Sequence, residues 1–316
     1  MSPIEMLRRA DPDILYGVYI PSWNRAGSAP LLEKLSRVDA IWRQDVTIVT
    51  RAESVVAYQQ AYPWSRVIAQ WGANGIGEAR MECLRDADKR GLPRITMLDD
   101  DIQHVSLLEW VQPEDSYPRS RRYSAAVCGE YPEPEMLCRS LAVARWTMNR
   151  VFDKFPKISY GALRNALFSQ GINPNLSTAW VNKGPFPSCV LMFEVARFSM
   201  RKMPTGFYRH GEDLAMLLHN LSEGQQAAIL VNAVYDQNGT VKTTIPLDPE
   251  SAEGRAADFA SAESYYPDIA RYLRVGSRNA SGGVRRWTLN WRRWSHDHPE
   301  YRERVITPVD VEIPGC

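Results

Sequence analysis

The sequence is short of net charge, of cysteine and of long apolar runs, and each shortage narrows the range of functions. Lys and Arg total 38 against 37 Asp and Glu, so the formal net charge is +1 and the isoelectric point is about 7.6. A chain with this balance has no global basic field to attract nucleic acid. Any contact with nucleic acid must therefore come from a local patch.

Cysteine is scarce and scattered. No two cysteines have the C-x-x-C spacing of zinc and redox sites, and their number is odd. This pattern fits a reducing compartment and argues against a disulfide scaffold or a zinc site. The five are Cys83, Cys128, Cys138, Cys189 and Cys316.

No apolar stretch approaches the ~18 residues that a membrane span needs. The first residues, MSPIEMLRRADPD, lack the hydrophobic core of a signal peptide. With 44% hydrophobic residues among 316, the chain can bury a sizeable core, as one large domain or two modest ones. We expect a soluble, cytoplasmic protein without a membrane partner.

Strand-like and helix-like segments alternate over the first hundred residues. β-Branched apolar runs predict strands at 14–20, 46–50, 66–70 and 94–98, with helical spacing between them and Gly91 at a helix end. Such alternation predicts a mainly parallel sheet covered by helices, which binds ligands at the carboxyl ends of its strands. Four segments follow those strands and are expected to converge there: PSWNRAG, TRAES, WGANGIG and DDDIQ.

The rest of the chain is less regular. Pro, Ser, Arg and Tyr without periodicity predict a long surface loop at 112–134, and a helix is expected at 135–155. Further strands are expected at 158–165, 187–198 and 226–236, and a helix is expected at 211–224. From about Leu247 the chain becomes polar and then basic.

Three consecutive aspartates, Asp99, Asp100 and Asp101, follow the strand expected at 94–98. Like charges side by side repel, and a divalent cation would relieve that repulsion. Carboxylate oxygens suit Mg²⁺ or Mn²⁺, which in turn bind phosphate oxygens. In the other interpretation one aspartate caps a helix and the others are solvated. The position after a fourth strand favours the metal.

Two loops carry weaker signals. In WGANGIGEAR, a glycine-rich turn into a helix presents backbone N–H groups to an anion, with Gly75 and Gly77 allowing close approach and Arg80 nearby. Many turns between a strand and a helix contain glycine, so this motif is weak alone. PSWNRAG offers Asn24 and Arg25 as polar side chains, or is an ordinary turn.

Glu212 and Asp213 open an expected helix in RHGEDLAM. The helix dipole favours acids at this position in any protein. A carboxylate there could instead act as a general base that takes a proton from an attacking hydroxyl group. His210 could tune that base or contact phosphate.

The segment from Arg271 to His296 holds seven arginines and no acid. Trp287, Trp291 and Trp294 fall at i, i+4 and i+7, which predicts one helical face. The plainer interpretation is a tryptophan stripe against the core with solvated arginines. The functional interpretation is a basic, aromatic surface for nucleic acid.

The chain resembles a nucleotide-sugar glycosyltransferase of the GT-A fold. The segments that carry this resemblance are, in chain order, YIPSWNRAG, VTIVTRAES, GANGIGEARMECLRDA, ITMLDDDI and GEDLAM. More narrowly, residues 15–236 are similar to the TET-associated glycosyltransferases encoded by phages. That family is expected to add a sugar to 5-hydroxymethylpyrimidines in DNA, after an oxygenase has made the hydroxymethyl group.

The resemblance implies an α/β fold of the GT-A (Rossmann-like) type: a mixed, mainly parallel sheet flanked by helices. It implies a glycosyltransferase domain at 1–246, with a donor-binding half at about 14–110 and an acceptor half at about 135–246. A basic extension at 247–316 would pack on that domain.

The resemblance also assigns roles to residues. Donor-binding residues would be Ser22, Asn24, Arg25, Gly77, Arg80, Asp99 and Asp100. Asp101 and Asp99 would bind the metal, completed by His298 or His296. Asp213, with Glu212, would be the base of an inverting reaction. DNA contacts would come from Arg285, Arg286, Trp291, Arg292 and Arg293.

The function expected from the resemblance is Mn²⁺- or Mg²⁺-dependent transfer of a sugar from a UDP-sugar to 5-hydroxymethylcytosine in phage DNA, in the host cytoplasm. One alternative keeps the chemistry and changes the acceptor to a carbohydrate, lipid or protein. A second is a non-catalytic module that binds nucleic acid.

Overall fold

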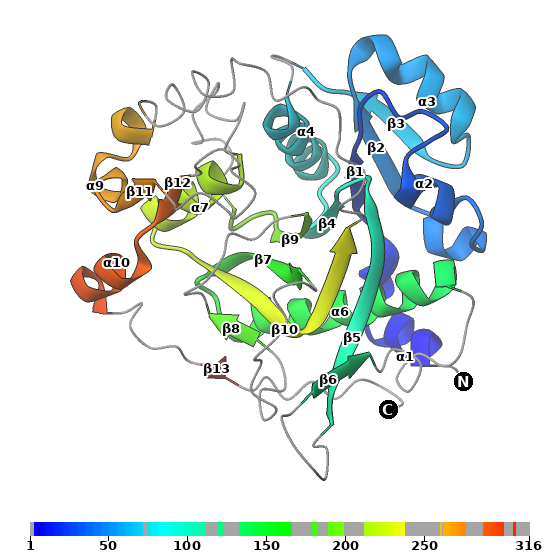
Figure 1. Cartoon of the computed structure of the whole chain (residues 1–316). Coiled ribbons are helices and arrows are strands. Elements are labelled where there is room, and N and C mark those ends of the chain that lie inside the picture. The colour runs from blue at the N-terminus through cyan, green and yellow to red at the C-terminus, as the bar shows by residue number, and fades with distance from the viewer. Residues whose placement is uncertain are drawn as a thin grey trace.

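A twisted mixed sheet with helices on both faces forms the body of the protein (Figure 1). The computed structural model describes residues 3–71, 75–111, 119–122, 133–165, 179–181, 189–198, 212–237, 260, 262–275, 287–299 and 306–307. The expected α/β architecture, a mixed sheet flanked by helices, is confirmed.

One half of the sheet is parallel, as the alternation of strands and helices predicts. Its strands lie in the order β3, β2, β1, β4, and each pair of neighbours is parallel. They are β1 (Val18–Pro21), β2 (Val46–Thr50), β3 (Arg66–Ala69) and β4 (Arg94–Leu98). Their carboxyl ends therefore meet at one edge of the sheet.

The other half of the sheet is mixed. β9 is antiparallel to both β4 and β7, β10 is parallel to β7, and the carboxyl-terminal part of β10 is antiparallel to β5. These strands are β5 (Ile102–Val111), β7 (Ile158–Asn165), β9 (Val190–Glu194) and β10 (Gln226–Gln237). The edge strands are β6 (Arg119–Arg122), β8 (Ala179–Val181) and β13 (Ile306–Thr307), and a separate ribbon pairs β11 (Leu273–Val275) with β12 (Trp287–Leu289).

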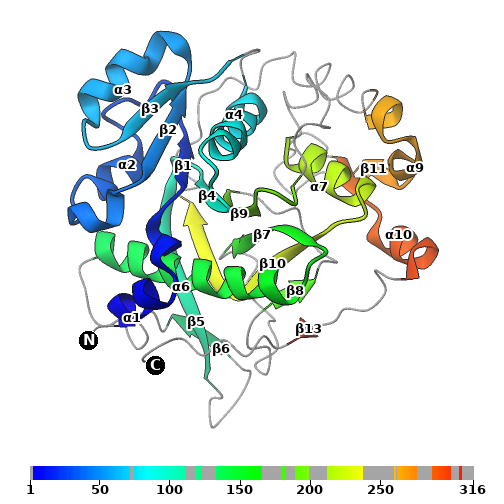
Figure 2. The ribbon, with the colours of Figure 1, turned by 180° about the vertical axis from the view of Figure 1, so that it is seen from behind.

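Helices cover both faces of this sheet (Figure 2). The α-helices are α1 (Pro3–Ala10), α2 (Pro30–Leu35), α3 (Val55–Ala61), α4 (Ile76–Lys89), α6 (Glu133–Lys154), α7 (Glu212–Ser222), α9 (Pro267–Ala270) and α10 (Trp291–Asp297). Short 3₁₀ helices are η1 (Pro12–Leu15), η2 (Ala40–Arg43) and η3 (Ala52–Ser54). Within the part of the chain that the structure describes, no helix has both the length and the apolar character to cross a membrane.

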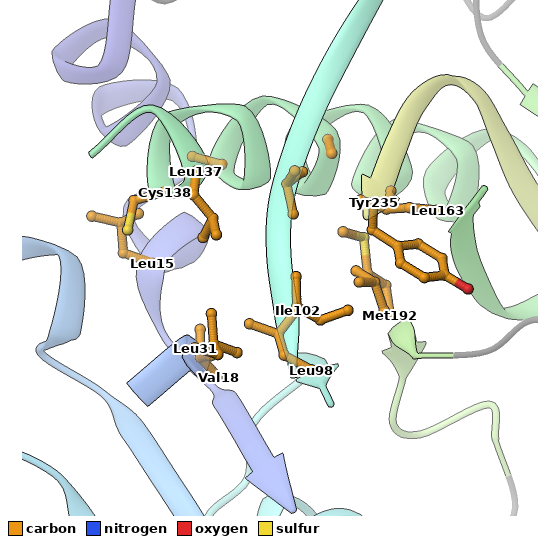
Figure 3. Close-up of a cluster of buried hydrophobic side chains, with 14 of the residues drawn as sticks. Leu15, Val18, Leu31, Leu98, Ile102, Leu137, Cys138, Leu163, Met192 and Tyr235 are labelled. Atoms are coloured by element: carbon orange, nitrogen blue, oxygen red, sulfur yellow. The ribbon is translucent and has the colours of Figure 1, made fainter. Parts of the chain in front are cut away.

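Alternation along the strands feeds two hydrophobic cores, one on each face. In β1, Val18 and Ile20 join the core under α6, whereas Tyr19 joins the core under α4 and α7. Figure 3 shows the first core, where Leu137 of α6 and Leu98 of β4 are among its members. Strands buried on both faces read as nearly continuous apolar runs, which is why VTIVT and RITML are recognisable.

Most predicted elements of the first half agree with the structure. β2 and β4 span the predicted residues, and Gly91 follows α4 with φ of +68°, as a residue after a helix end often does. The strand expected at 14–20 begins later, at Val18. The residues before it form η1, where the side chain of Asp11 accepts a hydrogen bond from the N–H of Asp13.

Two expectations in the later chain need correction. The segment 112–134 was expected to be a loop throughout, but β6 lies within it and pairs with β5, and α6 begins at Glu133. Trp287 does not share a helical face with Trp291 and Trp294, because it lies in β12. The side chain of Asn290 caps α10 by accepting from the N–H of Arg293, so the helix begins after Trp287.

The described C-terminal elements join the main body rather than standing apart. Tyr266, Tyr272 and Trp294 are buried in the same core as α7, and the Tyr266 hydroxyl lies 3.3 Å from Nδ1 of His219. β13 adds to the sheet beside β8. The division into residues 1–246 and an extension stays a prediction.

A charged cluster fixes α4 on the sheet. Asp86 of α4 accepts hydrogen bonds from the Tyr19 hydroxyl of β1 at 2.7 Å and from both terminal nitrogens of Arg66 at 2.5 and 2.6 Å. Arg90 donates to Tyr19 at 3.2 Å and to Asp45 at 2.6 Å. Burial alone would raise the pKa of Asp86, but the bonds from Arg66 and Tyr19 outweigh it and lower that pKa. The cluster therefore sets how α4 lies on β1 and β3.

Asp86→Asn should lower the free energy of unfolding by about 2 kcal/mol at neutral pH, because it replaces a charged bidentate partner with a neutral amide whose single acceptor oxygen cannot serve both Tyr19 and Arg66. Because the pKa of Asp86 is lowered in the fold, its stabilising effect is complete above the ordinary carboxyl pKa of about 4 and is lost as pH falls through the lower folded value. The difference between the two proteins should therefore shrink below pH about 4. Urea unfolding across pH measures this, with exposed Asp88→Asn on the same helix as control. A difference independent of pH would contradict the ion-pair account.

Candidate active site

Loops after β1, β2 and β4 and the start of α4 meet at the carboxyl edge of the parallel strands. The guanidinium of Arg51, after β2, lies 3.4 Å from the ring centroid of Trp23, after β1. Arg25 in the loop after β1 and Arg80 in α4 both bind aspartates that follow β4. Side-chain contacts thus bring together the segments after β1, β2 and β4, with Arg80 of α4 beside them, whereas residues 72–74 of WGANGIG lie outside the described residues.

Asp100 points into the protein and holds the loop after β1. The hydroxyl of Ser22 donates to Oδ2 at 2.5 Å, and Nη1 of Arg25 donates to Oδ1 at 2.5 Å. The Tyr58 hydroxyl of α3 lies 2.7 Å from Oγ of Ser22 and accepts from the N–H of Arg25 at 3.1 Å. Both carboxylate oxygens are thus engaged within the chain, so Asp100 shapes this loop.

The pKa values of Asp100 and Asp101 are both raised, and different neighbours oppose the rise in each. Burial raises the pKa of Asp100 to about 6, against the bond from Ser22 and the charge of Arg25, which lower it. Burial and then the charge of Asp99 raise the pKa of Asp101, against a bond from Gln237. Carboxylates whose charged form is disfavoured in this way are stabilised by any cation placed beside them.

Arg80 joins the two halves of the sheet at this edge. Its guanidinium is buried, donates to Asp99 after β4 at 3.0 Å and also donates to Asp213 in the first turn of α7. Asp99 and Asp213, predicted from separate motifs 114 positions apart by their numbers, are therefore neighbours across one arginine. A buried cation needs such partners, because an unpaired charge in the interior is costly.

The remaining predicted donor and catalytic residues have recognisable places. Asn24 is exposed, with φ of +55°, a left-handed conformation that asparagine adopts more readily than most residues. Gly77 is buried in the first turn of α4. Glu212 is the first residue of α7, and its side chain lies outside the described part of the structure. The roles of these residues in donor binding and catalysis stay predictions.

Three residues at this edge were not predicted from the sequence: Tyr58, Cys189 and Gln237. Nε2 of Gln237, the last residue of β10, lies 3.0 Å from Oδ1 of Asp101 and 3.0 Å from Sγ of Cys189. The carbonyl of Cys189 accepts from the N–H of Asp99 at 2.8 Å. Each contact joins segments far apart in sequence, so no local pattern signals it.

The C-terminal candidates lie in and beside α10, which is set apart from the carboxyl end of β4 in both views (Figures 1 and 2). The ring of His298 stacks on Trp294 with centroids 3.7 Å apart, and Nδ1 of His296 lies 2.9 Å from Asp297. Both contacts lie within the C-terminal segment. A role of His296 or His298 in the metal site stays a prediction.

In α10 the arginine side chains face solvent and the tryptophan side chains face the core, as the plainer interpretation expects. Arg292 and Arg293 are exposed, Trp291 packs partly against the core and Trp294 is buried. Arg285 and Arg286 lie outside the described residues. DNA contact by any of these residues stays a prediction.

The donor set at the end of β4 fits a hard divalent cation. Asp99 and Asp101 bring two carboxylates to one edge. Burial, followed by the charge of Asp99, raises the pKa of Asp101, and a nearby cation would oppose that effect. Among the described residues no group of three or more His, Cys, Asp or Glu side chains is arranged to hold a metal ion. A cation here would thus be held by one or two carboxylates together with substrate oxygens, as Mg²⁺ commonly is.

Asp99 and Asp213 thus face one another across a buried arginine, beside Asp100 and Asp101, at the carboxyl edge of the parallel strands. A model of the TET-associated glycosyltransferase family matches residues 16–244. The chain therefore belongs to the TET-associated glycosyltransferase family. No curated protein matches the chain.

Solved structures give distant likenesses. Glucosyl-3-phosphoglycerate synthase from Mycobacterium tuberculosis, in complex with Mg²⁺ and UDP, has 11% sequence identity and a TM-score of 0.49, covering 90% of this chain and 91% of that one. A mycobacterial protein has 11% identity and a TM-score of 0.46, covering 92% and 87%.

Arg80→Met should lower the free energy of unfolding by about 3 kcal/mol, because it leaves Asp99 and Asp213 facing each other without their shared cation. Arg85→Met on the same helix is the matched control. Arg85 is 40% exposed at its side chain and pairs with Glu78 and Glu82, so its removal should cost less than about 1 kcal/mol. Chemical denaturation measures both, and equal costs would contradict a central role for the Arg80 bridge.

Proposed function

We propose that the protein transfers a sugar from a UDP-sugar to the hydroxymethyl group of 5-hydroxymethylcytosine in phage DNA. Family membership makes sugar transfer the class of its chemistry. The observation that supports catalysis by this chain is the Arg80 bridge, which sets Asp213 beside Asp99 at the carboxyl edge.

The donor would lie along the ends of β1 and β4. Asp101, with Asp99, would hold Mg²⁺ or Mn²⁺, which when bound supplies positive charge against the developing charge of the leaving UDP. Ser22, Asn24 and Arg25 would line the nucleoside side. Asp100 takes part indirectly, because its bonds to Ser22 and Arg25 fix that loop.

At the start of α4, Gly77 would allow the diphosphate to approach the backbone. Arg80 would face the diphosphate while it keeps its bonds to Asp99 and Asp213.

Asp213 would act as the base, with Glu212 beside it. The hydroxymethyl oxygen of the acceptor attacks the anomeric carbon and forms the new C–O bond. The bond from that carbon to the UDP oxygen breaks, with its electron pair leaving on UDP. The acceptor proton goes to the carboxylate of Asp213. A single displacement of this kind inverts the configuration at the anomeric carbon.

DNA would contact the exposed arginines of α10 and the preceding segment. Arg292 and Arg293 are exposed and lie on one turn of α10. Together with Arg285 and Arg286 they would bind phosphates, and Trp291 would add an aromatic edge. The hydroxymethyl group on C5 of cytosine lies in the major groove, and turning the target base out of the stack would bring that group to Asp213. The expected location is the cytoplasm of the infected cell.

A carbohydrate, lipid or protein acceptor is the second candidate. The observation that favours it is the net charge of +1, which gives no general attraction to DNA. The transfer assay described next separates a DNA acceptor from these other acceptors.

The first test is a transfer assay with Mn²⁺ and a panel of UDP-sugars. Matched duplexes with cytosine or 5-hydroxymethylcytosine serve as acceptors, and nucleoside mass spectrometry gives the product. We expect a hexose-sized gain on the modified base alone. Metal-dependent release of UDP without that gain would retain the glycosyltransferase and reject this acceptor.

Asp101→Ala should lower metal-dependent turnover by at least about 100-fold, because it removes the proposed direct ligand. Its circular dichroism and melting temperature should stay near those of the wild type. Turnover at the wild-type level in the variant, with Mn²⁺ present, would reject the metal assignment.

Arg292→Gln with Arg293→Gln should weaken DNA binding and reduce the slope of log Kd against log salt by up to ~2, since each arginine that no longer meets a phosphate reduces that slope by about 1. Fluorescence anisotropy with a labelled duplex, over salt concentrations from about 50 to about 200 mM, measures this. Arg150→Gln, at an exposed position of α6, is the control. An unchanged slope would remove α10 from the DNA contact.

A further inference from the structure

Gln237 places a neutral amide against one of the three aspartates. Its Nε2 donates to Oδ1 of Asp101 at 3.0 Å and lies 3.0 Å from Sγ of Cys189. The carbonyl of Cys189 in turn accepts from the N–H of Asp99 at 2.8 Å. One amide and one cysteine therefore hold both aspartates of the proposed metal site.

Strand pairing carries Gln237 to this position. β5 begins at Ile102, directly after Asp101, and Gln237 is paired with Ile102. The register of the β5–β10 pair shifts between Asp236 and Gln237, since Asp236 pairs with His104. Such an irregularity re-aims a side chain at the end of a strand. Here it sets the amide beside Asp101.

Cys189 occupies an unusual backbone conformation at the start of β9. Its φ is +64°, in the left-handed region that a non-glycine residue adopts only at some cost. In that conformation its carbonyl meets the N–H of Asp99 and its sulfur meets Gln237. Burial, followed by the charge of Asp99, raises the pKa of its thiol.

The three aspartates have partners of different charge. Asp100 binds the guanidinium of Arg25 and Asp99 binds that of Arg80. Within the described part of the chain, Asp101 accepts a side-chain bond from the neutral amide of Gln237. A neutral donor fixes the orientation of a carboxylate without cancelling its charge. It also occupies one oxygen, Oδ1, of that carboxylate.

We propose that Gln237 is a positioning residue for the divalent cation: its amide orients the Asp101 carboxylate, with Cys189 as the fixed neighbour of both. The inference rests on the proposed function, because it assumes that Asp101 binds the cation. Partners that orient metal ligands typically contribute about 10–100-fold to metal affinity. A role confined to the stability of β10 would leave metal affinity unchanged.

The test is direct Mn²⁺ binding, by electron paramagnetic resonance of free Mn²⁺, with UDP present. Gln237→Met keeps the length of the side chain and removes the amide. We expect Mn²⁺ affinity to fall about 10–100-fold and the melting temperature to stay near that of the wild type. Gln226→Met, at the opposite end of the same strand, is the matched control and should bind Mn²⁺ normally. Asp101→Ala should abolish binding.

The outcomes separate this inference from the function on which it rests. If Asp101→Ala abolishes Mn²⁺ binding and Gln237→Met leaves it unchanged, the positioning role is wrong and the proposed metal site stands. If Gln226→Met weakens binding as much as Gln237→Met, the effect belongs to the strand and the inference is overturned. If the wild type binds no Mn²⁺, the proposed metal site fails and the inference fails with it.

Discussion

A buried arginine between two carboxylates is the contact on which the arrangement of the proposed site depends. Arg80 comes from α4, Asp99 from the end of β4 and Asp213 from the start of α7, so one guanidinium ties a helix of the parallel half to a helix of the mixed half. Because a buried cation without partners costs several kcal/mol, on the order of 3–5, the two acids that face Arg80 stabilise the fold. The position of α4 is fixed separately by Asp86 and Tyr19. The contacts of Asp86 that hold α4 on the sheet therefore also determine where Arg80, near the amino-terminal end of the same helix, is placed.

The aspartate triplet shows how neighbouring residues of one type acquire different roles. Successive side chains at the end of a strand point in different directions, so each aspartate meets a different environment. Asp100 meets Arg25, Asp99 meets Arg80, and Asp101 meets Gln237. Repulsion within the triplet, expected from the sequence, is relieved for two of them by arginines of the chain itself. The third is held by a neutral amide, which leaves its charge for a cation.

Local patterns predicted the parallel half of the fold and only part of the site. Continuous β-branched runs identify β2 and β4 because both faces of those strands are buried, whereas Trp287 has helical spacing and lies in a strand, since the cap at Asn290 decides where α10 begins. Asp99 and Asp213 were recognised because each lies at a strand or helix end that local sequence defines. Their meeting through one arginine, and the contacts of Gln237, depend on strand order and register, which periodicity does not encode. A shift of one residue in the β5–β10 pair would turn the amide to the other face of the sheet.

Charge balance at the carboxyl edge gives a physical reason for a cation there. Asp100 binds the guanidinium of Arg25, and Asp99 and Asp213 bind that of Arg80, whereas Asp101 accepts from the amide of Gln237. This group of four carboxylates and two guanidiniums has two more negative charges than positive ones. Burial makes that excess costly, as the raised pKa values of Asp100 and Asp101 indicate. One divalent ion has the charge that would balance it. A substrate that brought a diphosphate without a cation would increase the excess, so donor and cation are expected to bind together at this edge.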